Sequence, residues 1–411
     1  MSQGSPVLSF DNTENAFAYL SDARLRKANW LFASMGNQAL VSFGIRATNW
    51  AIKAGLPIKG LIRATIFEQF VGGETLEQTA PVAARLGAYG VKVILDYGVE
   101  GGESSEKAFD HACDEFIRVV DYAATQPNIP FISIKVTGIS RFGLLEKLDQ
   151  SVSEAGGTLN ERYTRALETL SPDERDEWQR VHARMERICG VASEKSVGVL
   201  VDAEETWVQD PVDMLTMLMM DKYNKGRAIV YNTAQLYRHD RLEFVRDCIE
   251  AAEKRGFVLG LKIVRGAYME KERERANDKG YASPIQPDKA ATDRDYDEAL
   301  RLCIGHIDNA AIIVATHNEE SSLLAARLLS ESGLATDHPH IHFSQLYGMS
   351  DNITFNLAKA GFPVSKYLPF GPIRDVIPYL MRRAQENTSV AGQTGRELSL
   401  IRRELKRRKG G

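Results

Sequence analysis

The residues with the clearest capacity for chemistry lie near the C-terminus, in the segment DVIPYLMRRAQEN. If this segment is helical, Tyr379, Arg382, Arg383 and Glu386 fall at i, i+3, i+4 and i+7 and share one face. Two adjacent arginines beside a tyrosine can bind a carboxylate or a phosphate through paired hydrogen bonds. A solvated face with arginine–glutamate ion pairs has the same spacing, so the helix alone leaves both interpretations open.

A second group of polar side chains follows short apolar runs, at the points where strands would leave a core. These residues are Asp96, Lys135, Asp202, Glu204, Gln235, Lys262, Arg265, Thr316, His317, Asn318, Gln345, Lys366 and Tyr367. A single polar strand end is equally consistent with a structural and a functional role, whereas eight such ends together favour one shared site. Three of the residues are lysines, which would also suit a Schiff-base aldolase.

Two other kinds of site are disfavoured. His338, His340 and His342 alternate, and an HxH pair can bind metal, but this pair opens its strand instead of closing it. We therefore expect no metal. No GxGxxG segment follows a strand, so we expect no Rossmann dinucleotide site.

The elements that must position these groups are eight apolar, β-branched runs separated by amphipathic segments. The runs cover residues 91–96, 131–136, 197–202, 228–232, 258–264, 311–315, 340–345 and 364–368. Helices are expected between them over residues 105–125, 241–254, 293–308, 319–332 and 351–360. Runs such as VKVILD are apolar throughout, as buried parallel strands are. Eight strands alternating with helices favour an α/β fold of the closed (β/α)8 type over an open sheet, with function at the carboxyl ends of the strands.

Residues 1–86 precede the first strand and are expected to form a helical arm. Its helices would cover residues 16–37, 38–54 and 76–86. Thr75 followed by Gln78 is the pattern of a capping box at the start of the last helix.

Residues 87–395 would form the barrel domain, in which one connection, residues 138–196, is too long for a single crossover. Gly156-Gly157 interrupts it, and Ser171-Pro172-Asp173-Glu174 is a complete helix start, so we expect a helical insertion. Residues 396–411 form a basic tail with six cationic residues from Arg402 to Lys409. This tail would be either a solvated terminus or a helix on a membrane surface.

Composition narrows the class of protein. Among 411 residues, 51 Lys and Arg against 55 Asp and Glu give a net charge of −4, which disfavours nucleic acid as the main partner. The four cysteines are far apart and form no CxxC pair, which fits reduced thiols in a cytosol-like compartment.

The first twenty residues lack the basic region of a secretory signal, and no apolar run approaches the roughly 20 residues that cross a bilayer. We expect a cytoplasmic protein, at most peripheral on the inner face of the membrane.

Taken together, the motifs resemble those of the proline dehydrogenase family, flavin-dependent enzymes that oxidise proline. The resemblance is carried by FEQFVGGET, VILDYGVEG, ISIKVTG, VLVDAEET, NTAQLY, LKIVRGAYMEKER, ATHN, FSQLYGM, KYLPFGP and PYLMRRAQEN, in family order from about residue 67 to 390. It implies a distorted (β/α)8 barrel that binds FAD at its carboxyl end. The implied reaction converts L-proline to 1-pyrroline-5-carboxylate by hydride transfer to flavin N5, the first step of proline catabolism, with electrons passed on to a quinone. Only the dehydrogenase module is apparent, so the resemblance is to the monofunctional enzymes.

The resemblance also implies roles for individual residues. Arg382 and Arg383 would bind the proline carboxylate with help from Lys135, and Asp202 would be the acidic residue nearby. Glu386 would pair with the arginines. The side chains that would enclose the pyrrolidine ring are Tyr268, Leu346, Tyr367 and Tyr379. The residues that would contact FAD are Ala203, Gln235, Lys262, Val264, Arg265, Gly266, Ala267, Thr316, His317 and Asn318.

Two residues in this set say more about the reaction. Lys262 stands where some relatives have arginine, near the reactive ring nitrogen of the flavin, and with Asp202 it is expected to be catalytic. Tyr367 stands where relatives that prefer hydroxyproline have a small polar residue, which implies proline as the substrate. The alternatives are a Schiff-base barrel lyase and, more distantly, a proline sensor without enzymatic activity.

The other side of the C-terminal helix is apolar. Val376, Ile377, Leu380, Met381 and Ala384 form one stripe at helical spacing. We expect this stripe to dock the helix on the barrel, so that the two arginines reach over the barrel mouth.

Overall fold

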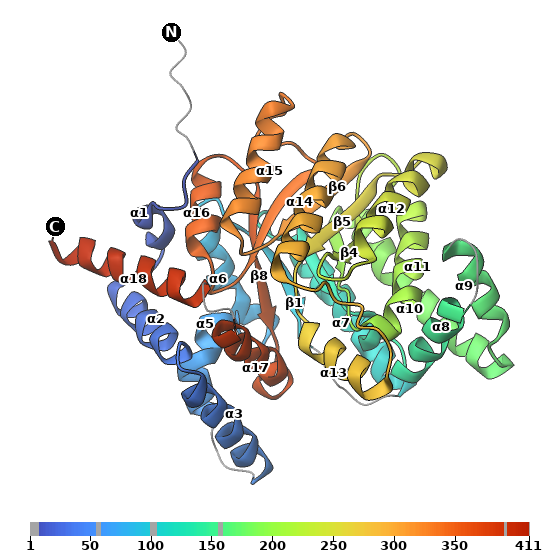
Figure 1. Ribbon diagram of the computed structural model, residues 1–411, viewed down its shortest axis with the longest axis horizontal. Helices are drawn as coiled ribbons and strands as arrows, with labels where there is room; N and C mark the ends of the chain where they lie inside the picture. Colours follow the sequence, from blue (N-terminus) through green and yellow to red (C-terminus); the bar gives the residue numbers. More distant parts are fainter. Residues whose placement is uncertain (1–7, 55–58, 99–104, 155–158, 390–392, 411) are drawn as a thin grey trace. The chain divides into compact units, whose positions relative to one another are not determined.

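The computed structural model describes residues 8–54, 59–98, 105–154, 159–389 and 393–410. Eight strands form a closed barrel in the order β1 to β8 (Figure 1). The strands are β1 (Lys92–Tyr97), β2 (Phe131–Ile134), β3 (Gly198–Val201), β4 (Val230–Gln235), β5 (Leu259–Val264), β6 (Ala310–Ala315), β7 (Ile341–Leu346) and β8 (Val364–Phe370). Each predicted run overlaps one strand, and the (β/α)8 fold is confirmed.

The chain divides into two compact units. The first contains Met1–Glu100 and Ser344–Gly411, and the second contains Gly101–Phe343. The first unit has helices α1 (Thr13–Phe17), α2 (Asp22–Met35), α3 (Gln38–Lys53), α4 (Lys59–Ile62), the π-helix η1 (Arg63–Phe67), α5 (Glu68–Phe70), α6 (Leu76–Gly87), α16 (Asp351–Lys359), α17 (Ile373–Ser389) and α18 (Gln393–Gly410). The second has α7 (Glu106–Ala124), the 3-10 helix η2 (Val136–Gly138), α8 (Phe142–Glu154), α9 (Leu159–Glu168), α10 (Pro172–Lys195), α11 (Thr206–Tyr223), α12 (Arg241–Arg255), α13 (Met269–Lys279), α14 (Lys289–Gly305) and α15 (Glu319–Glu331).

In the second unit, neighbouring strands from β2 to β6 pair in parallel, as their uniformly apolar sequences predict. The predicted insertion between β2 and β3 is helical and consists of η2, α8, α9 and α10. Ser171 begins α10 with the predicted capping box, because its hydroxyl accepts the Glu174 N–H at 3.3 Å and its own N–H donates to the Glu174 carboxylate at 2.8 Å. The predicted break at Gly156-Gly157 lies outside the described residues.

In the first unit, β1 pairs in parallel with β8 from Lys92 opposite Ser365 to Tyr97 opposite Phe370. The single helix predicted over residues 16–37 is two helices, because the Ser21 side chain accepts the Arg24 N–H and starts α2. The capping box predicted at Thr75 is wrong: the Thr75 side chain makes no cap hydrogen bond, and the Gln78 side chain instead accepts the Glu74 N–H at 2.8 Å.

The apolar stripe of α17 is covered by helices of the first unit. Val376, Leu380 and Ala384 are buried in a cluster with Leu31 of α2 and Leu400 of α18. The main neighbours of α17 are α3, η1, α2 and α18. The expectation that this stripe docks on the barrel is therefore wrong for most of its length, because apolar faces of the helical arm and of the C-terminal helix bury it instead.

Candidate active site

Asp202 holds two of the predicted lysines in the second unit. It follows β3, and its carboxylate lies 3.1 Å from Lys135 Nζ and forms an ion pair with Lys262 Nζ of β5. Ser133 of β2 donates a third hydrogen bond to the same carboxylate at 2.8 Å. The side chains of Lys135, Asp202 and Lys262 are 14%, 12% and 7% exposed. The barrel thus brings three predicted site residues together in a largely dry environment.

This cluster carries a net positive charge, since one carboxylate serves two ammonium groups. Excess positive charge suits a site where negative charge develops during a reaction. A Schiff-base lyase needs a lysine amine that is free to attack a carbonyl carbon, whereas both lysines here are held in ion pairs with Asp202. The third strand lysine, Lys366, is fully buried in the first unit with its Nζ 2.8 Å from Asp351. All three lysines therefore have a carboxylate partner.

Gln235 is the last residue of β4. Its side-chain nitrogen is hydrogen-bonded, whereas its side-chain oxygen has no hydrogen-bond partner among the described residues. Its side-chain amide donates to the Glu204 carbonyl at 2.8 Å and to the Tyr237 hydroxyl at 2.9 Å. Its buried Oε1 has no hydrogen-bond partner among the described residues. A buried acceptor without a donor is destabilising by about 1–3 kcal/mol, so this oxygen is suited to accept a hydrogen bond from a bound molecule or a water.

The segment Thr316-His317-Asn318 links β6 to the N-terminus of α15. Asn318 caps the helix by accepting the Ser321 N–H at 3.1 Å, and its own N–H donates to the Thr316 hydroxyl at 3.1 Å. Arg265, which follows β5, donates to the same hydroxyl at 2.8 Å. A helix N-terminus beside an arginine suits a phosphate group.

Arg265 is itself held firmly. Its guanidinium stacks over the Tyr296 ring at 3.7 Å and lies 2.9 Å from the Asp293 carboxylate. Of the other predicted cofactor contacts, Ala203 is buried, Val264 and Gly266 are half-buried and Ala267 is exposed. A Cβ at position 266 would lie 2.5 Å from the Met269 sulfur, so a larger residue there would require the flexible Met269 side chain to move.

The predicted carboxylate clamp lies in the first unit, on α17. Arg383 is buried and its guanidinium lies 5.2 Å from the centre of the Tyr379 ring, while Arg382 is half-buried. Tyr367 of β8 is also half-buried, and its carbonyl accepts the Tyr347 N–H at 2.9 Å, just after Leu346 ends β7. The side chain of Glu386 lies outside the described part of the structure.

A family model described as proline dehydrogenase matches residues 80–396, which is most of the chain. The chain belongs to the proline dehydrogenase family.

Two relatives agree with this assignment, and a solved structure agrees with the fold. The chain is 34% identical over 378 residues to mitochondrial proline dehydrogenase 1 of Arabidopsis thaliana, covering 85% of this chain and 76% of that one. It is 34% identical over 365 residues to hydroxyproline dehydrogenase of Xenopus laevis, covering 84% and 78%. Proline utilization A (PutA) from Bdellovibrio bacteriovorus, inactivated by N-propargylglycine, matches with a TM-score of 0.70 and 19% identity. That match covers 95% of this chain but 40% of the PutA chain, and at such low identity it supports the fold alone.

The structure of this proline dehydrogenase family member also shows a buried acid that had no predicted role. Glu204 appeared among the polar strand ends, but its sequence context did not reveal how it is held. Its carboxylate accepts the Thr137 hydroxyl at 2.6 Å and the Thr137 N–H at 3.3 Å. Burial raises the pKa of Glu204 from 4.5 to about 7, although the Thr137 hydrogen bond and the Lys135 charge lower it.

Glu204→Gln should remove a pH dependence of folding stability. Because the folded state raises the pKa of this acid, the folded protein binds more protons than the unfolded chain between about pH 4.5 and 7. The free energy of unfolding of the wild type should therefore fall across this range, by about 3 kcal/mol from this group. Urea unfolding at pH 5 and pH 8 should show the variant gaining stability relative to the wild type as pH rises.

A second buried acid, Asp149, does not disturb that comparison. Burial raises its pKa to about 8, so it titrates over a similar range, but it is present in both proteins and its contribution cancels. If the two proteins lose stability in parallel between pH 5 and pH 8, Glu204 is already ionised in the folded state at low pH and the interpretation is wrong.

Metal ligation has no support in the described part of the chain, where no group of three or more His, Cys, Asp or Glu side chains could hold an ion. Two of the alternating histidines have other contacts. His340 Nδ1 lies 2.6 Å from the Ile307 carbonyl, and the His342 ring packs edge-on to Phe131 at 5.0 Å.

Proposed function

We propose that this protein is an FAD-dependent dehydrogenase that oxidises L-proline to 1-pyrroline-5-carboxylate and passes the electrons to a quinone. The observation that carries the proposal is the carboxylate of Asp202 shared by Lys135 and Lys262, within a chain of the proline dehydrogenase family. The close relatives include both proline and hydroxyproline dehydrogenases, so the substrate is part of the proposal.

Residues of the second unit suit a bound flavin. FAD would supply the acceptor for the hydride that leaves the carbon beside the substrate nitrogen. Lys262 would provide positive charge where the reduced cofactor carries negative charge. The unpartnered Oε1 of Gln235 would accept a hydrogen bond from the cofactor, and the α15 N-terminus with Thr316 and Asn318 would hold a phosphate.

Residues of the first unit suit the substrate. Arg382 and Arg383 would bind its carboxylate with charge-assisted hydrogen bonds, which fixes one end of a small molecule. Tyr367, Tyr379 and Leu346 would enclose the ring and exclude water. Lys135 and Tyr268 of the second unit are proposed to assist in substrate binding, as the resemblance implies.

Tyr367→Ser should shift substrate preference towards hydroxyproline. In the proposed site the tyrosine ring would fill the space that a ring hydroxyl needs, and serine would leave that space open and offer a hydrogen bond. We expect the ratio of kcat/KM for proline over hydroxyproline to fall by at least about tenfold. The hydrogen bond between the serine and the ring hydroxyl should contribute more than about 1 kcal/mol. Steady-state kinetics with both substrates measure this ratio, and Tyr367→Phe, which should keep the preference for proline, is the matched control. An unchanged ratio in the serine variant would show that Tyr367 does not set the specificity.

The reaction itself is tested by product formation. Purified protein supplied with proline and a soluble electron-accepting dye should reduce the dye and form 1-pyrroline-5-carboxylate in equal amounts. Colourless protein that borohydride links to a keto substrate through a lysine would instead support the Schiff-base lyase. The proposal includes peripheral contact with the membrane that holds the quinone.

A further inference from the structure

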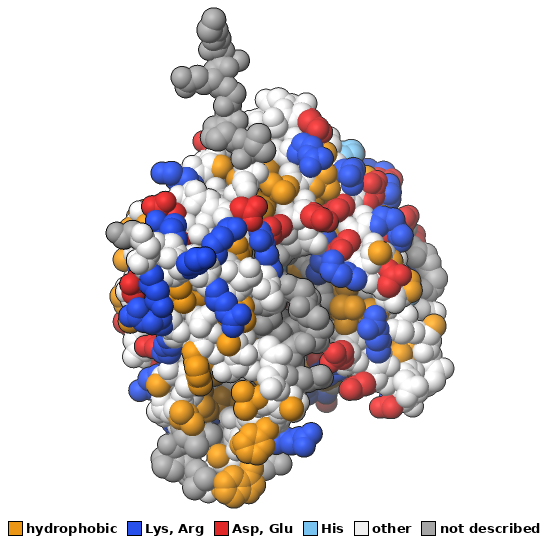
Figure 2. Space-filling model, turned by 60° about the vertical axis from the view of Figure 1, so that its left-hand side comes forward, with side chains coloured by type: hydrophobic (Ala, Val, Ile, Leu, Met, Phe, Trp, Pro, Cys, Tyr) orange, Lys and Arg blue, Asp and Glu red, His pale blue; other side chains and the backbone are white. Residues whose placement is uncertain are grey.

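The first unit exposes large apolar side chains in one region. Trp30 of α2 and Leu40, Phe43 and Trp50 of α3 are all more than half exposed, with Phe43 at 69% and Trp50 at 66%. We call these four residues the α3 surface. Orange side chains gather at the bottom of the molecule in Figure 2, over α3. Exposed apolar side chains grouped in this way commonly mark a site of interaction.

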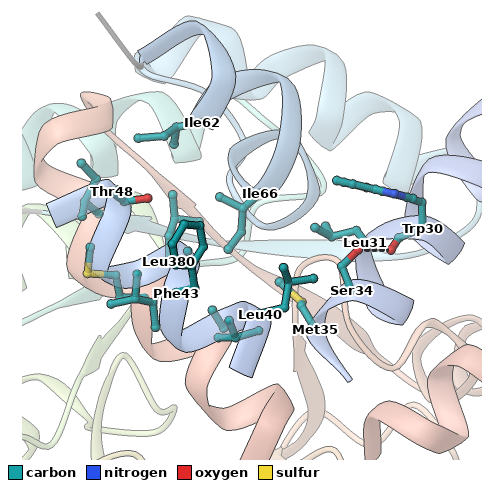
Figure 3. Close-up of a pocket in the computed structure, with 16 residues that line it drawn as sticks. Trp30, Leu31, Ser34, Met35, Leu40, Phe43, Thr48, Ile62, Ile66 and Leu380 are labelled. Atoms are coloured by element: carbon teal, nitrogen blue, oxygen red, sulfur yellow. Dashed lines mark hydrogen bonds between the residues drawn. The ribbon is translucent and has the colours of Figure 1, made fainter. Parts of the chain in front are cut away.

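The other side of α3 is apolar as well. Val41 and Ile45 line a cavity of about 350 Å³ with Ile62, Ile66 and Leu380 of neighbouring helices (Figure 3). Trp30, Leu40 and Phe43 belong to the lining too, so the cavity is continuous with the α3 surface. A helix with apolar side chains around most of its circumference is stable only when a further apolar phase covers it.

The stretch of sequence that contains the α3 surface carries basic residues and no acids. Residues 23–67 contain seven Lys and Arg and no Asp or Glu, whereas 55 acids in 411 residues would place about six in a stretch of this length. Arg24, Arg46 and Lys59 are exposed. Arg26, Lys27 and Arg63 pair with acids outside the stretch, namely Asp22, Glu68 and Glu74.

We propose that the α3 surface docks on an anionic lipid bilayer, with α3 lying in the plane of the interface. Tryptophan, phenylalanine and leucine beside lysine and arginine, without acids, are the composition of helices that lie on such membranes. A second copy of the chain fits less well, because a symmetric contact would bring two basic surfaces together. No helix among the described residues is long and apolar enough to cross a bilayer, which agrees with an in-plane arrangement.

The basic tail is the other part of the chain that was considered for membrane contact. It forms α18, which packs along α2 with Leu400 and Ile401 buried. Arg408 donates to Asp22 and to Glu404, both carboxylates of the first unit, at 2.9 and 2.8 Å, whereas Arg402, Arg403 and Lys406 are exposed. The apolar residues Leu400 and Ile401 of α18 are buried, whereas those of the α3 surface are exposed. The α3 surface is therefore better suited to contact a membrane.

The inference deepens the proposed function by naming where the enzyme meets the membrane that holds its quinone, and for that purpose it rests on the proposed function. Its test is co-sedimentation of the full chain with vesicles. Vesicles of phosphatidylcholine with one third phosphatidylglycerol should bind the protein at low ionic strength, at least about tenfold more tightly than phosphatidylcholine alone. Added salt should weaken the binding.

Variants locate the surface. Phe43→Glu combined with Trp50→Glu should lower vesicle binding at least tenfold, because each change removes apolar area and adds repulsion. Phe142→Glu is the matched control, since Phe142 of α8 in the second unit is also exposed at 40%, and it should bind as the wild type does. Circular dichroism and flavin content of each variant confirm folding.

Several results would overturn the inference. These are failure of the wild type to bind anionic vesicles, equal loss of binding in the Phe142 control, and full binding by the Phe43 and Trp50 variant. A dimer that light scattering detects in the wild type and that the same variant abolishes would assign the surface to self-association instead. Proline-dependent dye reduction on the same samples separates the two proposals, because vesicle binding without turnover would contradict the proposed function and leave this inference standing.

Discussion

Arg383→Met should raise the KM for proline by at least about 30-fold while FAD stays bound. Arg383 is buried on α17, and the flexible methionine side chain fills a similar volume without the guanidinium. Loss of one partner of a buried, hydrogen-bonded charge pair costs about 2–5 kcal/mol, and 2 kcal/mol corresponds to roughly 30-fold in affinity. Arg382→Met should have a smaller effect, because the half-exposed Arg382 is better screened by water.

The control for this prediction lies on the same helix. Arg374 of α17 has an 85% exposed side chain next to Asp375, and Arg374→Met should leave the KM for proline unchanged. Steady-state kinetics with a soluble acceptor, together with flavin absorbance per protein, measure all three variants. If the KM of Arg383→Met stays within about threefold of the wild-type value with FAD bound, Arg383 does not bind the carboxylate.

Asp202→Asn should abolish turnover and destabilise the protein by about 3–5 kcal/mol. The change removes the carboxylate to which Lys135 and Lys262, both largely buried, are ion-paired. Breaking a buried pair by removing one partner is costly because the remaining charge is uncompensated. Urea unfolding followed by circular dichroism measures the loss, and the midpoint should move to a clearly lower urea concentration.

Two further variants make this result specific. Asp114→Asn disrupts an ion pair with Arg187 in which both side chains are more than half exposed, and its effect should be below about 1 kcal/mol. Lys262→Met added to Asp202→Asn removes one of the two ammonium groups that lost the Asp202 carboxylate and should recover part of the lost stability. An Asp202→Asn protein that unfolds at the wild-type urea concentration would show that the cluster contributes little to stability.

The barrel could be predicted from sequence because each strand is a continuous apolar run and each crossover is amphipathic. Local signals also identified the start of α10, where Ser171 and Glu174 cap the helix. Other boundaries depend on single contacts that periodicity does not show. Ser21 divides the predicted first helix by capping α2, and the apolar stripe of α17 could have been covered by any apolar face of sufficient size.

The candidate site was predictable as a set of residues but not as a geometry. Asp202 and Lys262 are 60 positions apart in the chain, and their pairing follows from strand order, which spacing does not encode. The raised pKa of Glu204 results from burial, which outweighs the opposing effect of the Thr137 hydrogen bond. That burial comes from tertiary packing. The exposed face of α3 was also missed, because its apolar pattern is the same as that of a buried helix.

The most direct test of the proposed function is the absorbance spectrum of the purified protein during anaerobic addition of proline. The protein should be yellow from bound FAD, and proline should bleach the flavin absorbance, with hydroxyproline much less effective. A flavin spectrum that proline leaves unchanged, although proline binds, would contradict the proposed dehydrogenase and support a proline sensor.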